Sequence, residues 1–175
     1  MKTLVVVDMQ KDFIDGALGT KEAVAIVDNV KNKIDSCREQ GNQIIFTRDT
    51  HGANYLETQE GRNLPVEHCI EGTEGWQISD ALDVRPEDTV INKVSFGHNW
   101  FKDVTENPEF VKGEEIEIVG LCTDICVISN ALGLKTVFPE RPITVDAGCC
   151  AGVTPESHKN ALAAMKMCQI AVTGE

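Results

Sequence analysis

The sequence lacks clusters of basic residues. Its 16 lysines and arginines are outnumbered by 28 aspartates and glutamates, so the formal net charge is −12. Phosphate backbones and anionic membrane surfaces repel such a surface, and no local group of basic residues offsets the repulsion. The composition therefore argues against binding to nucleic acid and against attachment to membranes.

Long apolar runs are missing as well. The first apolar run, residues 4–7, is interrupted by Asp8 after only four residues. That is too short for the apolar part of a signal peptide and far too short to cross a bilayer. We therefore expect a cytoplasmic protein. Internal repeats and linkers are also absent, so the 175 residues predict one domain, residues 1–175.

The seven cysteines do not form the pattern of a disulfide-stapled protein. Their number is odd, and the C-x-x-C spacing of thioredoxin-like redox sites does not occur. In a reducing cytosol most of them are expected to be free thiols that pack as small core residues, and at least one is a candidate reactive thiol. They stand at positions 37, 69, 122, 126, 149, 150 and 168.

Short apolar runs alternate with helical patterns along the whole chain, which predicts βαβ units. The expected strands are residues 4–7, 44–47, 89–91, 115–119, 143–145 and 170–172. The expected helices are residues 22–40, a short one near 76–82, one from about 124, and one over 155–168 that Thr154 caps. We predict a three-layer α/β/α fold with a mostly parallel open sheet. Residues 50–75 have no clear period, and so long a loop is usually functional.

Reactive side chains follow four of the predicted strands. In open α/β sheets, ligands bind beyond the carboxyl ends of the strands, so these residues are expected to meet at one edge. That convergence is stronger evidence than any single residue. The residues are Asp8, then Asp49 and His51, then Lys93, and finally Cys122, Thr123, Asp124 and Cys126.

Cys126 is a candidate nucleophile because it stands near the start of a predicted helix. A helix N-terminus favours a thiolate, and its free N–H groups can hold an oxyanion. An isolated cysteine is more often a buried apolar residue, and Cys122 is an equally available thiol on this local evidence. Asp8 is either a turn cap or a base for the thiol, and Lys93 is either a solvated lysine or a group that favours the ionised forms of both.

A carboxylate and two histidines form a candidate metal site. Asp49 and His51 lie on the same side of an extended segment, and His68 returns from the long loop. Such ligands suit Zn²⁺ or another divalent first-row ion. Taken alone, the three residues are a weak signal, and a loop turn with two surface histidines is the commoner explanation of such a pattern. Glu57 and Glu60 lie in the same loop and could add an oxygen ligand.

Five segments of the chain are informative when they are taken together. They are residues 7–13 (VDMQKDF), 47–51 (TRDTH), 65–73 (PVEHCIEGT), 92–96 (NKVSF) and 120–127 (GLCTDICV). Together they resemble one family, the isochorismatase-like cysteine hydrolases, and within it the nicotinamidases. They occur in the family's order and span nearly the whole chain.

The resemblance implies specific roles for these residues. It implies a catalytic triad of Asp8, Lys93 and Cys126, with Cys126 rather than Cys122 as the nucleophile. It also implies a cis peptide bond between Leu121 and Cys122, and an oxyanion hole made by the backbone N–H groups of Cys122 and Cys126. The implied metal ligands are Asp49, His51 and His68, with Glu60 as a possible fourth.

The implied substrate pocket departs from the family's usual pattern. Nicotinamidases often carry a tryptophan shortly before the second metal histidine, whereas residues 64–67 here read LPVE. Phe13, Leu64, Phe96 and Trp100 are the expected pocket residues. The departure leaves open which amide is the substrate.

The resemblance implies a zinc-dependent amidohydrolase that converts nicotinamide to nicotinate and ammonia through a cysteine thioester, in the salvage of NAD. One alternative is another small amide or an isochorismate-like substrate. A second is a thiol redox or metal-binding module without turnover, suggested by Cys122-x-x-x-Cys126 and the pair Cys149-Cys150. The expected partner is a small-molecule amide, and relatives usually assemble as homo-oligomers.

Overall fold

Six short apolar segments form one open sheet in the computed structural model, which describes residues 1–175. All neighbouring strands are parallel, in the order β3-β2-β1-β4-β5-β6. The predicted α/β fold with a parallel sheet is therefore confirmed. The strands are β1 (Lys2–Val7), β2 (Gln43–Asp49), β3 (Thr89–Lys93), β4 (Glu115–Leu121), β5 (Ile143–Ala151) and β6 (Ala171–Thr173).

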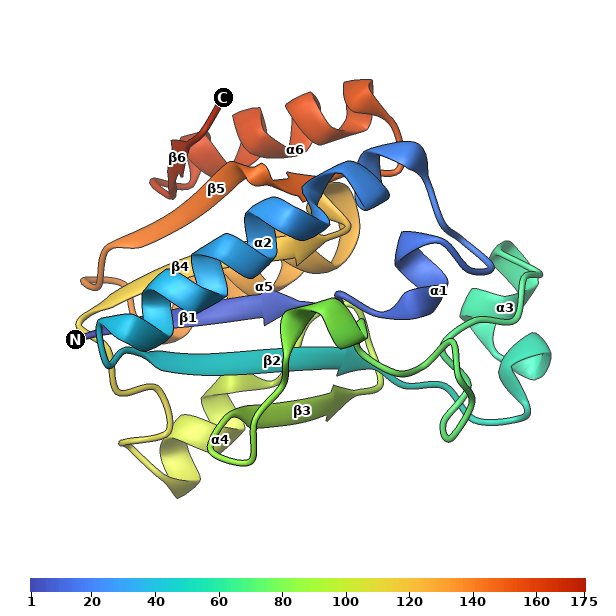
Figure 1. Cartoon of the computed structure of the whole chain (residues 1–175), viewed down its shortest axis with the longest axis horizontal. Helices are drawn as coiled ribbons and strands as arrows, with labels where there is room; N and C mark the ends of the chain where they lie inside the picture. Colours follow the sequence, from blue (N-terminus) through green and yellow to red (C-terminus); the bar gives the residue numbers. More distant parts are fainter.

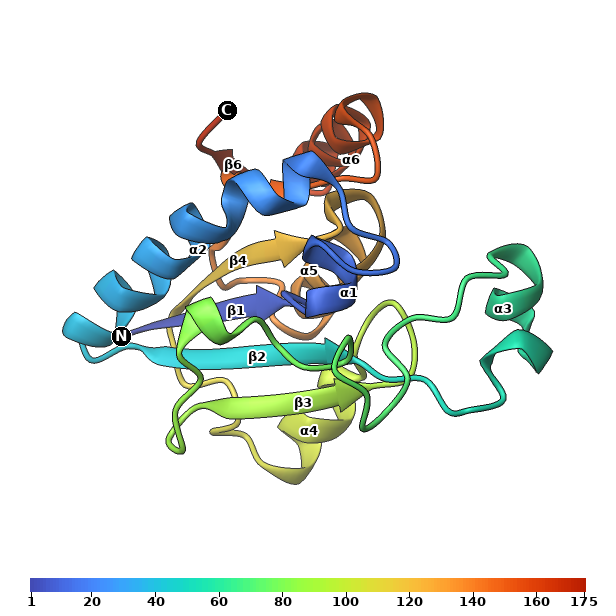
Figure 2. The ribbon, with the colours of Figure 1, turned by 45° about the vertical axis from the view of Figure 1, so that its right-hand side comes forward.

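Helices cover both faces of this sheet, as Figures 1 and 2 show. Leu4 and Val6 of β1 pack into a core shared with α2, whereas Val5 and Val7 pack into a second core shared with α4, α5 and α6. Because β1 is central and covered on both faces, its run of apolar residues is continuous rather than alternating. The helices are α1 (Lys11–Ile14), α2 (Lys21–Glu39), α3 (Gln59–Asn63), α4 (Trp100–Glu106), α5 (Ile128–Val137) and α6 (Pro155–Met167).

The two long outer helices begin at threonine caps. The Thr20 hydroxyl accepts a hydrogen bond from the N–H of Ala23 at the start of α2. At the start of α6 the predicted cap by Thr154 is confirmed, with Pro155 in the first turn, and Ser157 completes a capping box that was not predicted. None of the helices is long and apolar enough to cross a membrane.

Strand β4 is longer than predicted, because Gly120 continues the strand instead of ending it. Gly120 has φ +120°, and a Cβ at this position would lie 2.1 Å from the carbonyl oxygen of Val7. Only glycine allows β1 and β4 to approach so closely here. The strand therefore delivers Leu121 and Cys122 to the sheet edge directly beside Asp8.

Other departures lie in the connecting segments. The helix expected near residues 76–82 is a single 3₁₀ turn, η2 (Asp80–Leu82), and α4 was not predicted at all. Residues 50–75 are not structureless: they contain the 3₁₀ turn η1 (Tyr55–Glu57) and α3, which project beyond the carboxyl ends of the strands (Figure 2). This projection forms an outer wall over the sheet edge at which the predicted site residues converge.

Candidate active site

Lys93 lies at the centre of the residues that the carboxyl ends of the strands bring together. Its Nζ lies 2.7 Å from Asp8 Oδ2, 3.1 Å from Asp49 Oδ1 and 3.4 Å from Cys126 Sγ. A further hydrogen bond of 3.1 Å goes to the carbonyl oxygen of Ser95. Although burial alone would lower the pKa of Lys93, the negative charges of the Asp8 and Asp49 carboxylates outweigh it and raise that pKa. The ammonium is therefore charged throughout the physiological pH range.

Asp8 is a fully buried carboxylate held by two partners. Its Oδ1 accepts a 2.6 Å hydrogen bond from the Thr47 hydroxyl, and Oδ2 faces Lys93. The residue has φ 47°, a left-handed conformation that turns the chain as it leaves β1. Burial raises the pKa of Asp8 above its ordinary value, against the opposing charge of Lys93. A carboxylate with a raised pKa is a better proton acceptor near neutrality.

Cys126 lies in the π-helical turn η3 (Thr123–Val127) that precedes α5. It is only 4% exposed, and burial raises the pKa of its thiol well above the ordinary value. The charge of Asp8 also raises this pKa, while Lys93 lowers it. Burial at this helix start therefore acts against the thiolate that the helix N-terminus favours, so a base beside the thiol is needed for attack.

The two neighbouring thiols are not equivalent. Lys93 lies within hydrogen-bond distance of Cys126 but not of Cys122. Burial, followed by the charge of Asp124, raises the pKa of Cys122 to about 12. The peptide bond between Leu121 and Cys122 is cis, as the family resemblance implied. All seven cysteines are free thiols in the structure.

The three predicted metal ligands and the candidate fourth, Glu60, lie close together beside Lys93. One ligand atom from each of Asp49, His51, Glu60 and His68 lies within 4.8 Å of all the others. Burial alone would raise the pKa of Asp49, but the close contact with His51 and the charge of Lys93 lower it. Glu60 belongs to the short helix α3, and this helix brings its carboxylate next to the other three ligands.

The histidines are oriented toward one point. The Nε2 atom of His51 is buried and has no hydrogen-bond partner, although Asp49 Oδ2 lies 2.9 Å away. The Nδ1 atom of His68 lies 2.8 Å from the carbonyl oxygen of Val66, which directs Nε2 toward the same point. A buried nitrogen without a hydrogen bond, surrounded by two carboxylates and a second imidazole, fits a divalent cation.

Two supporting residues were not recognised in the sequence. The fully buried Gln10 holds the main chain of Asp49, since Nε2 donates to its carbonyl oxygen (2.8 Å) and Oε1 accepts from its N–H (2.7 Å). The buried Tyr55 packs edge-on against His51 and His68, with ring centres 4.7 and 5.0 Å away. Gln10 lies within the quoted motif of residues 7–13, but its partner lies 39 positions away. No local pattern signals such a contact.

A cavity of about 690 Å³ opens onto both groups, and Cys126, Asp49, Glu60 and His68 lie in its wall. Three predicted pocket residues, Phe13, Leu64 and Phe96, line it. Trp100 does not, and this prediction needs correction. Its indole is buried in the second core, and Nε1 donates to Asn130 Oδ1. The cavity also has apolar walls that the sequence analysis did not identify, including Leu18, Leu121, Ile125 and Val153.

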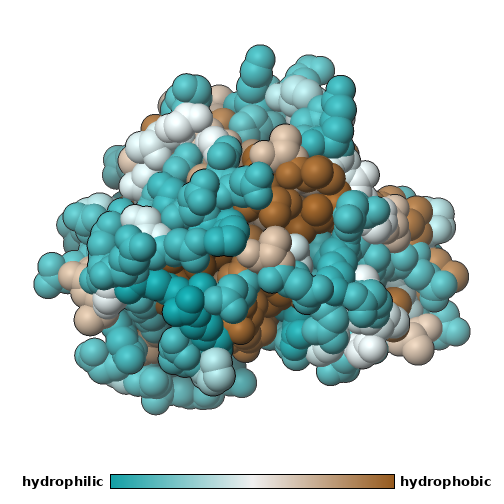
Figure 3. Space-filling model, in the orientation of Figure 1, coloured by the Kyte–Doolittle hydropathy of each residue, from teal (hydrophilic) through white to brown (hydrophobic).

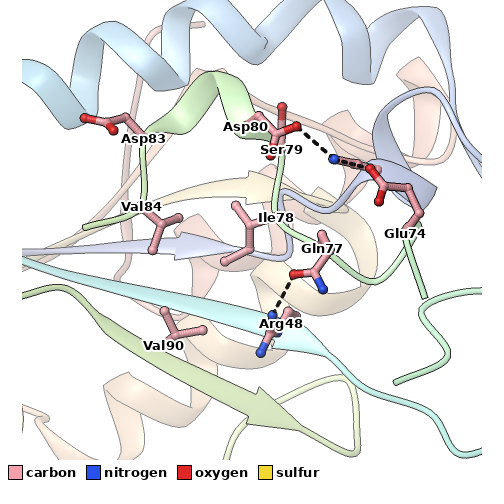
Figure 4. A pocket seen from close by; sticks show the side chains of 10 residues that line it. Arg48, Glu74, Gln77, Ile78, Ser79, Asp80, Asp83, Val84 and Val90 are labelled. Atoms are coloured by element: carbon pink, nitrogen blue, oxygen red, sulfur yellow. Dashed lines mark hydrogen bonds and ion pairs between the residues drawn. The ribbon is translucent and has the colours of Figure 1, made fainter. Parts of the chain in front are cut away.

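A second cavity, of about 700 Å³, lies between η2 and the β2–β3 side of the sheet (Figure 4). In the orientation of Figure 1, most of the visible surface belongs to hydrophilic residues, and hydrophobic residues gather near its centre (Figure 3). Its charged groups are largely paired: Lys11 bridges Glu74 and Asp80, and the Arg48 guanidinium lies 3.4 Å from the centre of the Trp76 ring. No thiol or histidine lines it, so the first cavity is the candidate active site.

The sequence of the chain matches the family model of the isochorismatase domain over residues 2–175, which is nearly the whole chain. The chain belongs to the isochorismatase family. The resemblance seen in the sequence is thereby confirmed, and with it the prediction of a hydrolase that acts on C–N bonds.

Within this family the chain is similar to proteins named nicotinamidases. It is 27% identical to the nicotinamidase of Escherichia coli, over 95% of this chain and 90% of that protein. It is equally similar, at 27% identity over 93% of the chain and 87% of the relative, to a probable inactive nicotinamidase of Arabidopsis thaliana. A pyrazinamidase of Pyrococcus horikoshii, solved in complex with zinc, superposes with a TM-score of 0.84 at 27% identity and covers 99% of both chains.

Proposed function

We propose that this isochorismatase-family protein is a metal-dependent cysteine amidohydrolase that converts nicotinamide and water to nicotinate and ammonia. The observation that carries the proposal is the position of Lys93 Nζ, 2.7 Å from Asp8 and 3.4 Å from Cys126. Cys126 lines a cavity together with Asp49, Glu60 and His68, which are three of the four candidate metal ligands. One bound amide would therefore meet a nucleophile, Cys126, and a base, Asp8, with the Lys93 ammonium close to both.

The first half of the reaction forms a thioester. Asp8 takes the proton of the Cys126 thiol, and Lys93 stabilises the thiolate as it forms. The sulfur attacks the amide carbonyl carbon, and the carbonyl π electrons move to oxygen. When this oxyanion collapses, the C–N bond breaks and the leaving nitrogen takes the proton from Asp8, which releases ammonia.

The second half returns the enzyme to its starting state. Asp8 takes a proton from a water molecule, and the water oxygen attacks the thioester carbonyl. The C–S bond breaks, the acid product leaves, and the thiolate recovers its proton from Asp8. In both halves the backbone N–H groups of Cys122 and Cys126 are the proposed donors to the oxyanion.

The residues Asp49, His51, His68 and Glu60 would hold a divalent ion, and their chemistry suits zinc. When bound there, such an ion would supply a Lewis acid for the ring nitrogen of nicotinamide. Residues of this chain would orient the ring, because Phe13 and Phe96 line the same cavity as Cys126, the proposed nucleophile for the carboxamide.

Zinc binding is expected at one ion per chain and should raise the melting temperature, because the folded state alone brings the ligands together. Calorimetric titration of the chelator-treated protein and thermal unfolding measure both effects. His51→Ala should lose them. His98→Ala is the matched control, since His98 pairs with Asp103 outside this group. Absence of stoichiometric metal would contradict the metal site and would favour an isochorismate-like substrate.

Release of ammonia from nicotinamide by the zinc-loaded protein tests the proposed function directly. Turnover that depends on Cys126 supports it. If the folded, metal-replete protein does not hydrolyse nicotinamide, nicotinamide is not its substrate. One relative at the same level of identity is named a probable inactive nicotinamidase.

The size of the cavity favours a second candidate substrate, a larger amide with an apolar group. Cavities of about 300–1,000 Å³ usually enclose drug-sized ligands, which are bigger than a single ring with one carboxamide. Exposed apolar side chains also gather around this cavity: Leu64, Val94, Phe96 and Val153. Comparison of nicotinamide with ring-alkylated nicotinamides and with apolar aliphatic amides distinguishes the two candidates.

Three other expectations stay predictions. Formation of nicotinate would give the protein a role in the salvage of NAD. Its assembly as a homo-oligomer and its cytoplasmic location are testable by light scattering and by cell fractionation.

A further inference from the structure

The side chain of Asn130 connects the nucleophile turn to one wall of the cavity. Asn130 lies in the first turn of α5 and is fully buried. Its Nδ2 donates hydrogen bonds to the carbonyl oxygens of Cys126 (2.8 Å) and Phe96 (3.3 Å). Its Oδ1 accepts from the N–H of His98 (3.0 Å) and from the indole Nε1 of Trp100 (2.9 Å).

These four bonds use the whole hydrogen-bonding capacity of an amide side chain, which has two N–H donors and two acceptor lone pairs. The partners also define its orientation. A reversed amide would turn its oxygen toward two carbonyl groups and its nitrogen toward two N–H groups. One partner belongs to the nucleophile turn, and the other three belong to residues 96–100.

Residues 95–100 form one segment, and its first two residues, Ser95 and Phe96, form a wall of the cavity. This segment is tied down at both ends: Lys93 Nζ donates to the Ser95 carbonyl oxygen (3.1 Å), and Asn130 holds Phe96, His98 and Trp100. Phe96 itself is 46% exposed, so its ring has little packing of its own. Its position therefore depends on the main chain beneath it, and that main chain depends on Asn130.

We propose that Asn130 is a positioning residue that sets the spacing between Cys126 and the Phe96 wall of the cavity. It thereby determines how closely a planar amide is held against the thiol. The inference rests on the proposed function for its substrate, but the spacing itself can be tested without turnover.

Asn130→Ser is designed to keep the hydrogen bond to Cys126 and to remove the three hydrogen bonds to residues 96–100. A serine hydroxyl in a helix can donate to the carbonyl group four residues earlier, which here is Cys126, but it is too short to reach residues 96–100. We expect the KM for nicotinamide to rise about tenfold or more because the wall is released, with a much smaller change in kcat. Thr136→Ala is the matched control, since its hydroxyl bonds the Leu132 carbonyl oxygen of the same helix far from the cavity.

Alkylation of Cys126 by iodoacetamide, mapped by mass spectrometry, supplies the readout that does not require turnover. We expect alkylation to become faster at Cys126 while the buried thiols Cys37 and Cys150 stay protected. This combination of poorer substrate binding and easier reagent access is not expected from a general loss of stability. If the wild-type protein does not hydrolyse nicotinamide, the proposed function fails while this test still decides the role of Asn130.

Unchanged KM and unchanged alkylation of Cys126 in Asn130→Ser would overturn the proposal. Equal increases at Cys37 and Cys150 would also count against it, because they would show general loosening. If Asn130→Ser does not fold, Trp100→Phe retains a buried ring and removes one of the four bonds. The same local rise in Cys126 alkylation is then expected, and its absence would be decisive against the proposal.

Discussion

Cys126→Ala is expected to abolish amide hydrolysis in a protein that stays folded and still binds zinc. The substitution removes the sulfur that lies 3.4 Å from Lys93 and leaves the backbone N–H groups of η3 in place. Loss of a nucleophile usually lowers kcat by at least about 10⁴-fold, because the remaining groups act as a unit with it. Ammonia release under saturating nicotinamide, with zinc content and thermal unfolding measured on the same sample, checks this result.

Cys122→Ala separates the two neighbouring thiols. It retains the backbone N–H of residue 122, and Cys122 makes no hydrogen bond to Lys93, so we expect a loss of less than about tenfold. The exposed Cys168→Ala serves as the control for general effects of removing a thiol. Substantial turnover in Cys126→Ala, or a greater loss in Cys122→Ala, would refute the assignment of the nucleophile.

Lys93→Met is expected to damage both catalysis and stability. Methionine retains the length and apolar character of the lysine stem but leaves Asp8 and Asp49 buried without their shared cation. Removal of one partner from a buried ion pair costs about 3–5 kcal/mol in unfolding free energy. We also expect kcat to fall about 10²–10³-fold, since the thiolate and the ionised base lose their stabilising charge. Urea unfolding and steady-state kinetics measure the two effects.

The stability defect of Lys93→Met should depend on pH in a definite direction. Without the ammonium, the pKa of Asp8 rises further, because burial already raises it and Lys93 is the main opposing influence. The folded state then binds a proton that the unfolded state releases, so stability is lost as pH rises through the window between the two pKa values. With EDTA present, the difference in unfolding free energy from wild type should be larger at pH 8 than at pH 5. An equal loss of unfolding free energy at both pH values would show that the Asp8 carboxylate is not the charge that the substitution leaves without a partner. Lys31→Met, on the surface of α2, controls for loss of a lysine.

The sequence predicted the fold class well, because the relevant signals are local. Buried parallel strands read as short apolar runs, and Thr154 with Pro155 defines the start of α6. Order along the chain is enough to bring the ends of β1 to β4 to one sheet edge. The connecting segments were less predictable: α3 and α4 have five and seven residues, too few to establish a helical period.

The sequence by itself determined which residues are candidates for chemistry and, through five ordered motifs, the family. Tertiary structure decided how they act on one another. Only the fold brings Lys93 to Cys126 rather than to Cys122. It places Trp100 in the core, where the sequence analysis had expected a pocket residue. It also surrounds Asn130 with residues about thirty positions away. It also decided the direction in which the pKa of the Cys126 thiol shifts, because burial raises that pKa. Desolvation and contacts between distant segments depend on what packs around a residue, and no local pattern of amino acids encodes that.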